Sequence, residues 1–434
     1  MLSIKPYKGT RDFYPEDKRL QKLIFNQIRS VVQSYGYEEY DAPIVESIDL
    51  FKAKSGEEIV NEQTYSFEDR SGRKLTLRPE MTPSVSRMVA AKRQELAYPL
   101  RWYSIPNLWR YERPQRGRLR EHWQLNVDIF GVDNINAELE LIQLSDKILK
   151  SFGAKSDSYL IKLNSRKFVD YIFNEFFGLN GLASKKVIKL VDRMHKLEPV
   201  KFEESLREII AEAKSPAPVV DEIISLLKIK NIEYLPLPLK SHESLISLYE
   251  LMNDLKKLGI ENYVFDITLM RGFDYYTDVV FEVFDTSTIN NRAMLGGGRY
   301  NGLVGLFGVE PVATAGFGFG DVTLLDFLEV HKLLPTVKPE TDVYVIVIGN
   351  HYVKADKFID ELRKNGINVA VDLTERKMAA RIKTADKKKI PFVMFIGEEE
   401  ITKNKIVLKN ILNGEESTLT INQAITGIKI FKNN

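Results

Sequence analysis

Cysteine is absent from this sequence of 434 residues, and histidine is rare, with five in all. The absence of cysteine excludes disulfides, thiolate metal sites and a cysteine nucleophile. No two histidines are spaced to bind one metal ion from a single element, which argues against a zinc enzyme. The sequence also lacks an apolar run of the roughly 18 residues that a membrane span needs, and its first residues lack the apolar segment of a signal peptide. We therefore expect a cytoplasmic protein.

The composition is that of an ordinary globular protein, with 44% hydrophobic and 28% charged residues, and the length suffices for two or three domains. The net charge of +2 is unevenly distributed. Residues 338–434 carry 17 Lys and Arg against 13 Asp and Glu, a net of +4, which leaves −2 for the remainder. A basic C-terminal module on a near-neutral body fits a polyanionic partner. On charge alone, however, a solvated lysine-rich face is the better explanation.

Hydrophobic periodicity divides the chain into four segments. Residues 1–164 mix helical and strand patterns, and residues 165–258 are almost wholly helical. Residues 259–332 return to strand character and then contain a glycine-dense stretch from Gly296 to Gly320. Residues 333–434 begin with a proline-containing linker and continue as alternating strands and helices, which predict a mostly parallel sheet.

Within the first segment, turn and cap signals set several boundaries. The periodicity predicts a helix over 18–36 and a strand over Tyr37–Ala42. Tyr65–Glu68 and Lys74–Leu77 flank a turn sequence and predict a hairpin. A further helix is expected from Pro83 to about Arg93, with Thr82 as its cap.

The arginine-rich stretch at residues 101–131 carries the strongest chemical signal. Two strand-like runs, Leu100–Tyr111 and Trp123–Gly131, bracket a basic loop and predict an antiparallel pair. Arg110 is expected in the first strand, pointing away from the aromatic residues beside it, and a guanidinium suits a phosphate because its fork is bidentate. In the second run the polar residues Gln124, Asn126 and Asp128 alternate with apolar residues. This polar face fits the floor of a nucleotide site, and the ion-paired surface of a hairpin fits the spacing equally well.

Residues 109–131, WRYERPQRGRLREHWQLNVDIFG, resemble motif 2 of class II aminoacyl-tRNA synthetases in the form found in histidyl-tRNA synthetases. Residues 21–43 resemble the dimer-forming motif 1, and Leu77–Thr82 is similar to the amino-acid-binding strand. Met270–Thr277 resembles the histidine-specific RGLDYY segment, and Gly297–Leu303 is similar to its companion GGRYDGL. The resemblance covers the whole chain, and the last two motifs are its most specific part.

The resemblance implies a fold and its division into domains. The catalytic core would be α+β, an antiparallel sheet with flanking helices, formed by residues 1–164 and 259–332. Residues 165–258 would be a helical insertion, and residues 333–434 a C-terminal α/β domain like the anticodon-binding domain of several class II enzymes. The similarity to motif 1 implies a homodimer.

The activity implied is that of a ligase. It would make histidyl-adenylate from histidine, ATP and Mg²⁺, and then transfer histidine to the 3′ hydroxyl of tRNA(His). Joining a carboxylate to the α-phosphate requires fixed positive charge. The resemblance assigns Arg110 and Arg271 to the two sides of that phosphate and Gln124 to the substrate carboxylate. The residues it assigns to ATP are Arg110, Glu112, Arg118, His122 and Thr323.

The residues that the resemblance assigns to histidine come from several motifs: Glu80, Thr82, Gln124, Asp128, Arg271, Tyr275, Tyr276 and Tyr300. Glu80 and Thr82 would hold the α-ammonium group, a task that suits a carboxylate and a hydroxyl. Asp128 and two tyrosines would surround the imidazole and could read both ring nitrogens. Taken alone, the pair Tyr275–Tyr276 is better explained as part of a core.

Three positions depart from the family pattern. Thr323 stands where motif 3 has an arginine that binds the γ-phosphate. Either another cation serves, with Arg113, Arg118 and Arg299 as candidates, or the site is weakened. His122 replaces the phenylalanine that stacks on adenine, and an imidazole can still stack. Asp128 replaces a glutamate, so the substrate imidazole must come closer or be reached through water.

Contacts to tRNA are expected from the motif 2 loop and from the C-terminal domain. The candidates are Arg116, Arg376, Arg381 and Lys383. Arginine and lysine would bind backbone phosphates, and such binding weakens steeply with salt.

A second function remains open at this stage. The chain could be the catalytically inactive, synthetase-like regulatory subunit of ATP phosphoribosyltransferase, and the missing motif 3 arginine favours that alternative. Arg110, Glu112 and Arg271 together oppose it. The α/β segment after Leu333, which that paralogue is expected to lack, opposes it as well.

Overall fold

The structure of the protein is a computed structural model, which describes residues 2–52, 63–213, 218–270, 275–290 and 292–433. By their contacts the residues form two compact units. The first unit comprises the chain up to Phe13 together with Gln21–Pro335, and the second comprises Tyr14–Leu20 together with the chain from Thr336 onward. Each unit has its own sheet and its own core.

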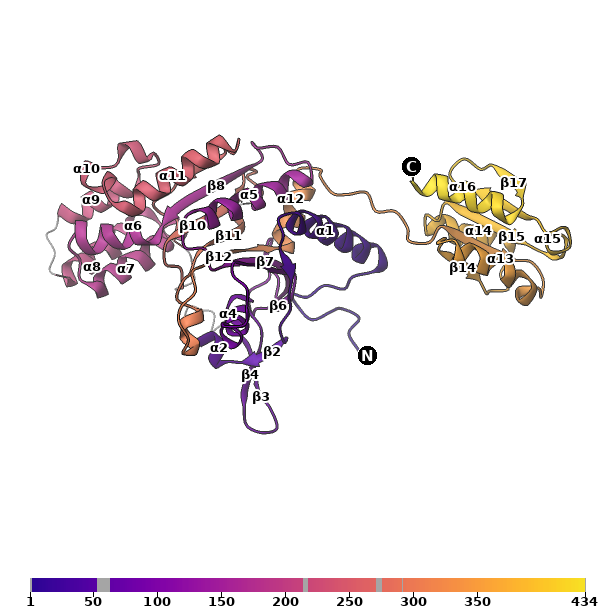
Figure 1. Cartoon of the computed structure of the whole chain (residues 1–434), viewed down its shortest axis with the longest axis horizontal. Helices are drawn as coiled ribbons and strands as arrows, with labels where there is room; N and C mark the ends of the chain where they lie inside the picture. Colours follow the sequence, from indigo (N-terminus) through magenta and orange to yellow (C-terminus); the bar gives the residue numbers. More distant parts are fainter. Residues whose placement is uncertain (1, 53–62, 214–217, 271–274, 291, 434) are drawn as a thin grey trace. The chain divides into compact units, whose positions relative to one another are not determined.

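A large sheet forms the centre of the first unit (Figure 1). In the described residues it has nine strands: β1 (Glu38–Glu39), β5 (Leu100–Ser104), β6 (Asn107–Trp109), β7 (Glu121–Phe130), β8 (Tyr159–Ser165), β9 (Tyr263–Phe265), β10 (Val279–Asp285), β11 (Ala293–Arg299) and β12 (Thr314–Gly320). The order is β1-β5-β7-β12-β11-β10-β8-β9, and β6 also pairs with β7. All pairs are antiparallel except β1 with β5 and β8 with β9. The predicted antiparallel sheet is therefore confirmed for the strands between its two edges.

Helices α5 (Asn136–Ser151) and α12 (Asp321–Val330) lie along one side of this sheet (Figure 1). In α5 the apolar residues Leu141, Leu144 and Ile148 recur at helical spacing, and all three are buried. Helix α1 (Pro15–Ser34) likewise buries Ile24, Ile28 and Val32 on one stripe. The element order places each of these helices directly beside a sheet strand in the chain, which is how their apolar faces reach the core.

A second, three-stranded sheet has the order β2 (Val45–Ser47), β4 (Lys74–Leu77) and β3 (Tyr65–Glu68). Strands β3 and β4 form the predicted hairpin, and Gly72 in its turn has φ 76°, a conformation that favours glycine. Short helix α2 (Asp49–Lys52) packs with β2 and with α4 (Thr82–Ala91). Thr82 is the first residue of α4 and Met81 its N-cap, so the cap predicted at Thr82 is wrong by one residue.

The helical segment after β8 is confirmed. It contains α6 (Arg166–Tyr171), η1 (Ile172–Phe176), α7 (Gly181–Asp192), η2 (Met194–Lys196), α8 (Pro199–Glu212), α9 (Pro218–Leu227), η3 (Ile232–Tyr234), α10 (Leu237–Lys240) and α11 (Glu243–Lys257). These helices gather at one end of the large sheet, where α6 contacts β8 and β10 (Figure 1).

The second unit is an α/β domain built on a five-stranded sheet with the order β14-β13-β15-β16-β17. Its strands are β13 (Val343–Val347), β14 (Val369–Asp372), β15 (Phe392–Ile396), β16 (Ile406–Asn410) and β17 (Glu416–Leu419). Its helices are α13 (Tyr352–Lys364), α14 (Met378–Lys387), α15 (Glu398–Lys403) and α16 (Ile421–Asn433). The pairs of β13 with β14 and β15 are parallel, whereas β15–β16 and β16–β17 are antiparallel. The sheet is therefore mixed and not mostly parallel, because the chain returns as a hairpin after β15.

One prediction about strands in the first unit is wrong. The predicted first strand of the motif 2 pair is broken at Ile105 and Pro106 into β5 and β6, and Arg110 lies just after β6 instead of within a strand. Proline supplies no N–H to a ladder, which explains the break. The glycine-dense stretch contains β11 and β12, and both are paired on two sides within the sheet. Glycine is intrinsically a poor strand former, so tertiary pairing overrides its propensity here.

Among the described residues, none of the helices combines the length and the apolar character that crossing a lipid bilayer requires.

Candidate active site

The larger of two adjoining cavities lies over β7, β11 and β12 and has a volume of about 260 Å³. All the residues that the resemblance assigns to ATP line it: Arg110, Glu112, Arg118, His122 and Thr323. The first three come from the connection between β6 and β7, His122 from the start of β7, and Thr323 from the first turn of α12. The sheet thus brings together residues that lie far apart in the sequence.

The smaller cavity has a volume of about 30 Å³. Seven of the eight residues assigned to histidine line it: Glu80, Thr82, Gln124, Asp128, Tyr275, Tyr276 and Tyr300. The eighth, Arg271, lies outside the described residues. Arg110, Gln124, Gly296 and Gly318 line both cavities, so two ligands held in them would meet beside Arg110 and Gln124.

Arg110 is held at this junction by the backbone around it. Its Nε donates a hydrogen bond to the carbonyl oxygen of Pro79 at 2.8 Å, and its backbone N–H bonds the carbonyl of Arg120 at 2.8 Å. These two bonds restrict the guanidinium to the place where the cavities join. A guanidinium that is oriented before a ligand arrives binds an anion with less loss of entropy.

The predicted polar face of β7 is confirmed, because Gln124, Asn126 and Asp128 all line the smaller cavity. The strand opposite, β12, places Gly320, Gly318 and Gly316 in register with these three residues. A Cβ atom at Gly318 would collide with the Gln124 amide, and one at Gly316 would collide with the Asp128 carboxylate and lie 2.6 Å from Tyr300 Oη. The glycines of β12 therefore leave room for the polar side chains of β7.

Asp128 is buried at the end of the smaller cavity, and two hydroxyl groups reach it. Tyr300 Oη donates a hydrogen bond to Asp128 Oδ1, and Tyr40 Oη donates to Asp128 Oδ2 at 3.4 Å. Burial raises the pKa of Asp128 to about 7, although both tyrosine hydrogen bonds favour its charged form. Burial and the neighbouring carboxylate also raise the pKa of Tyr300 well above its usual value. Asp128 can thus gain or lose its proton near neutral pH.

Tyrosines form the wall of the smaller cavity. The ring centroid of Tyr275 lies 4.9 Å from that of Tyr276 and 5.5 Å from that of Tyr300. Tyr275 Oη donates to Glu80 Oε2 at 3.3 Å, and both residues are buried. The wall therefore presents a carboxylate at one end, at Glu80, and a second carboxylate at the other, at Asp128.

His122 is the second residue of β7 and lines the larger cavity. Burial, together with the positive charges of Arg110 and Arg11, lowers the pKa of His122 to about 3. The imidazole is therefore neutral at physiological pH and presents an uncharged ring to the cavity. A neutral ring is compatible with the stacking role that the resemblance assigns to this position.

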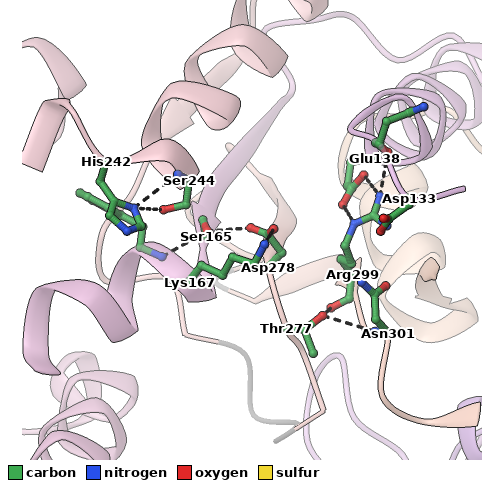
Figure 2. Close-up of polar contacts among 12 residues, drawn as sticks. Asp133, Glu138, Ser165, Lys167, His242, Ser244, Thr277, Asp278, Arg299 and Asn301 are labelled. Carbon is green, nitrogen blue, oxygen red and sulfur yellow. Dashed lines mark hydrogen bonds and ion pairs between the residues drawn. The ribbon is translucent and has the colours of Figure 1, made fainter. Parts of the chain in front are cut away.

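Of the three arginines considered as substitutes for the missing motif 3 arginine, only Arg118 lines the larger cavity. Arg299 is wrong for this role, because it is buried and forms a two-pronged ion pair with Glu138, with both N–O distances 2.6 Å (Figure 2). Its other N–H groups donate to the carbonyls of Val132 and Asn134. Thr323 itself brings no charge, and its hydroxyl lies 2.9 Å from the Met294 carbonyl oxygen.

The residues expected to contact tRNA differ in exposure. Arg116 is exposed, with Nε bonded to Asn290 Oδ1 at 2.9 Å and Nη2 3.7 Å from Asp326. Arg376 and Lys383 are exposed in the second unit. Arg381 instead donates to the carbonyls of Val347 and Asp372, each at 3.1 Å, and its side chain is only 11% exposed. These bonds favour a role for Arg381 in holding the second unit together over a contact with phosphate.

Two residues near the cavities were missed by the sequence analysis. Tyr40 reaches Asp128 because its backbone pairs with Tyr103 at the edge of the sheet. Arg292 directly precedes β11 and lines a third cavity beside the larger one. Arg292 belongs to no motif, and Tyr40 belongs only to the segment that resembles the dimer-forming motif 1. The pairing of distant strands brings both residues to the site.

The comparisons with known proteins agree with this geometry. A family model described as histidyl-tRNA synthetase matches residues 9–320, and one described as anticodon binding domain matches residues 342–430. The chain is 42% identical to a histidine–tRNA ligase of Leptospira biflexa, over 99% of this chain and 98% of the relative. It is 36% identical to a histidine–tRNA ligase of Thermoplasma volcanium, over 98% of each.

Solved structures of histidyl-tRNA synthetases have a fold similar to that of this chain. The apo histidyl-tRNA synthetase of S. aureus superposes with a TM-score of 0.74 at 27% identity, covering 98% of this chain and all of that one. A chain from Bacillus halodurans described as an ATP phosphoribosyltransferase regulatory subunit/histidyl-tRNA synthetase gives 0.73 at 23% identity, covering 92% and 99%, and shows a shared fold only. With one family model matching most of the chain and relatives above 30% identity over nearly all of it, this chain belongs to the histidyl-tRNA synthetase family.

Proposed function

We propose that this chain is a histidine–tRNA ligase, which activates histidine with ATP and transfers it to the 3′ end of tRNA(His). The observation that carries the proposal is the junction of the two cavities at Arg110 and Gln124. Activation needs a carboxylate and an α-phosphate side by side with positive charge between them. Histidine in the smaller cavity and ATP in the larger one would meet at this junction.

In the first step, a carboxylate oxygen of histidine attacks the α-phosphorus of ATP. The bond between that phosphorus and the oxygen that bridges to the β-phosphate breaks, and pyrophosphate leaves. Arg110 stabilises the negative charge that builds up on the α-phosphate, and Gln124 orients the histidine carboxylate. Arg271, which by resemblance stands on the far side of the phosphate, would supply a second positive charge. In the second step the 3′ hydroxyl of tRNA attacks the carbonyl carbon and AMP leaves.

Recognition of histidine is proposed to rest on the two carboxylates of the smaller cavity. Glu80 and Thr82 accept hydrogen bonds from the α-ammonium group, and Asp128 accepts one from a ring N–H of the imidazole. Tyr276 and Tyr300 enclose the ring. A site whose buried polar groups need a partner rejects amino acids that cannot supply one.

Mg²⁺ is proposed to enter bound to the phosphates of ATP. Mg²⁺ keeps several waters and phosphate oxygens and needs only one or two protein carboxylates. Glu112 is the carboxylate that lines the larger cavity, and it would serve as such a ligand or as a contact to the adenine. We also propose that the chain acts in the cytoplasm as a homodimer and binds tRNA through its second unit, which matches the anticodon binding domain model.

The regulatory-subunit alternative is not favoured. The relatives that match above 30% identity over the whole chain are described as histidine–tRNA ligases. The match to the Bacillus halodurans chain falls under 25% identity and supports a common fold only. Arg110, Glu112 and Gln124 also share one cavity, an arrangement that activation requires.

ATP–pyrophosphate exchange with each of the twenty amino acids tests the proposal. Histidine should support exchange far better than any other amino acid, because its imidazole can donate a ring N–H to Asp128 within the wall of tyrosines while its ammonium group reaches Glu80. Equally strong exchange with another amino acid, or exchange with none, would contradict the assignment. Charging of total tRNA with labelled histidine then tests the second step.

A further inference from the structure

A third cavity of about 50 Å³ adjoins the larger one and shares Gly117, Met294 and Thr323 with it. Arg292 lines this third cavity from the end of the β10–β11 connection. A Cβ atom at Gly117 would lie 3.4 Å from Arg292 Cδ and 3.6 Å from Thr323 Cγ2. The side chains of Arg292 and Thr323 therefore both border the space that a side chain at position 117 would occupy, and glycine leaves this space open.

The charges around Arg292 leave it without a dedicated anionic partner. No hydrogen bond or ion pair joins it to another residue in the described part of the chain. The two carboxylates nearby are engaged by other arginines: Glu112 lies 3.4 Å from Arg118 Nη1, and Asp326 lies 3.7 Å from Arg116 Nη2. Burial and the positive charge of Arg118 lower the pKa of Arg292, and the negative charge of Glu112 opposes this only in part. Two guanidinium groups that repel each other in a half-buried place are stabilised when an anion binds between them.

The position of this pair fits one part of ATP. If the α-phosphate lies at the junction with the smaller cavity, next to Arg110, the remaining phosphates must extend into the larger cavity. Among the residues that the structure describes, the cations that line that cavity are Arg110 and Arg118, and Glu112 offsets the charge of Arg118. Thr323 adds no charge on the side of α12. Mg²⁺ and Arg271 are proposed to act on the same nucleotide, and Arg292, which lines the cavity next to Thr323, is the described arginine on the side of α12 that has no other assigned contact.

We propose that Arg292 binds the terminal phosphates of ATP in this chain. Arg292 directly precedes β11, and its guanidinium would supply the positive charge that Thr323 of α12 does not provide. The proposal rests on the proposed function for the placement of the α-phosphate. The guanidinium acts by electrostatic stabilisation of the triphosphate and of the departing pyrophosphate, and it transfers no proton.

The variant Arg292→Gln tests this assignment in the full chain. In histidine-dependent exchange the KM for ATP and that for pyrophosphate should each rise by roughly tenfold or more, as expected when a charge-assisted hydrogen bond is lost. The KM for histidine should stay within about twofold. Arg292→Lys should lie between wild type and the glutamine variant, because an ammonium group keeps the charge but not the fork. The matched control Arg193→Gln, at an exposed position in the helical segment, should change none of these values.

Calorimetric binding of ATP and AMP separates a phosphate contact from loss of structure. Arg292→Gln should weaken ATP and leave AMP unchanged, since AMP has no terminal phosphates. Equal weakening of both nucleotides, or an unchanged affinity for ATP, would overturn the proposal. If the wild-type chain supports no exchange with histidine, the proposed function fails, while the comparison of ATP with AMP still decides the role of Arg292.

A second-site variant gives a positive test. Thr323→Arg places a guanidinium on α12 at a residue that lines both the larger and the third cavity. Combined with Arg292→Gln, it should restore at least part of the affinity for ATP, without changing that for AMP. A double variant that binds ATP no better than Arg292→Gln alone would argue that Arg292 does not share this phosphate subsite.

Discussion

At the scale of single residues, the buried Asp128 sets how stability and substrate binding depend on pH. Burial raises the pKa of its carboxyl to about 7 from an ordinary value of 3.8. The folded chain therefore keeps a proton on Asp128 over a pH range in which the unfolded chain has lost it. The stabilisation from this proton is fully present below about pH 4 and is lost as pH rises towards 7.

The variant Asp128→Asn should remove this dependence. The amide cannot ionise, so at pH 8 the variant should be more stable than the wild type by an amount on the order of 4 kcal/mol, the equivalent of about three pKa units. At pH 5 the two proteins should differ much less. Urea unfolding at the two pH values measures the difference, and an equal difference at both would contradict a titrating Asp128. The variant should also lose affinity for histidine, because its amide offers no negative charge to the imidazole.

The motifs of the sequence predict which residues gather around the two cavities, but they miss residues that only the pairing of distant strands brings there. Seven of the assigned histidine-binding residues and all the assigned ATP-binding residues line the two cavities, since each belongs to a motif of the family. Arg292 belongs to no motif, and Tyr40 belongs only to the segment that resembles the dimer-forming motif 1, so only the three-dimensional structure brings them to the cavities. The ion pair between Arg299 and Glu138 could not be predicted from the sequence either, because the two residues are 161 positions apart.

At the scale of elements, strand β12 shows why a composition that suggests a loop can form the centre of a sheet. Gly316 and Gly318 pair with β7 on one side and with β11 on the other. Their missing side chains make the space that Gln124 and Asp128 occupy. Sequence patterns identify strands by β-branched and apolar residues, and glycine gives no such signal. The long helical segment after β8 was predicted correctly because helical periodicity over many residues is unambiguous.

The variant Gly318→Ala should therefore damage activity more than stability. The new methyl group displaces the flexible Gln124 amide, and a displacement of about 1 Å at a reacting group can cost roughly a hundredfold in rate. Gly316→Ala should in addition destabilise the fold, because its methyl group would lie 2.6 Å from the backbone carbonyl oxygen of Val127, which cannot move aside. Histidine-dependent exchange and urea unfolding measure the two effects.

Gly181→Ala, in helix α7, is the control for these two variants, since no heavy atom lies within 4 Å of the position that its Cβ would take. It should leave both exchange and stability close to those of the wild type. If Gly318→Ala kept normal exchange, the glycine would not be needed to place Gln124.

At the scale of the whole molecule, the chain combines a unit that holds both cavities with a second unit that has a separate core. In the second unit, Val343 and Val345 of the five-stranded sheet pack with Phe358 of α13 and their neighbours on one face of the sheet. Tyr344, Ile346 and Val393 pack on the other. The residues between Leu333 and Asp342 form no helix or strand, and the boundary between the units falls after Pro335. The prolines of the sequence predict a linker in this region. They do not predict the mixed pairing of the five-stranded sheet, because the direction of β16 and β17 depends on whether a helix or a tight turn joins each strand to the one before it.

A chain that ends at Pro335 should separate the two steps of the reaction. It retains every described residue that lines the two cavities, so ATP–pyrophosphate exchange should remain within about twofold of the full chain. Charging of tRNA should fall by roughly a hundredfold or more, the equivalent of about 3 kcal/mol of lost binding. Leu333 is kept because its side chain would lie 3.5 Å from a Cβ at Gly153 in the first unit. Equal losses in both assays would mean that the second unit supports the catalytic unit instead of binding tRNA.

Point variants in the full chain complete this test without removing any structure. Lys383→Gln and Arg376→Gln alter exposed side chains of the second unit and should raise the KM for tRNA alone. Each phosphate contact that is lost should reduce the slope of log affinity against log salt by about 0.7 to 0.9. Arg381→Gln should instead lower the stability of the second unit, because its guanidinium bonds the carbonyls of Val347 and Asp372. A salt slope that Lys383→Gln and Arg376→Gln leave unchanged would place the phosphate contacts of the second unit elsewhere on its surface.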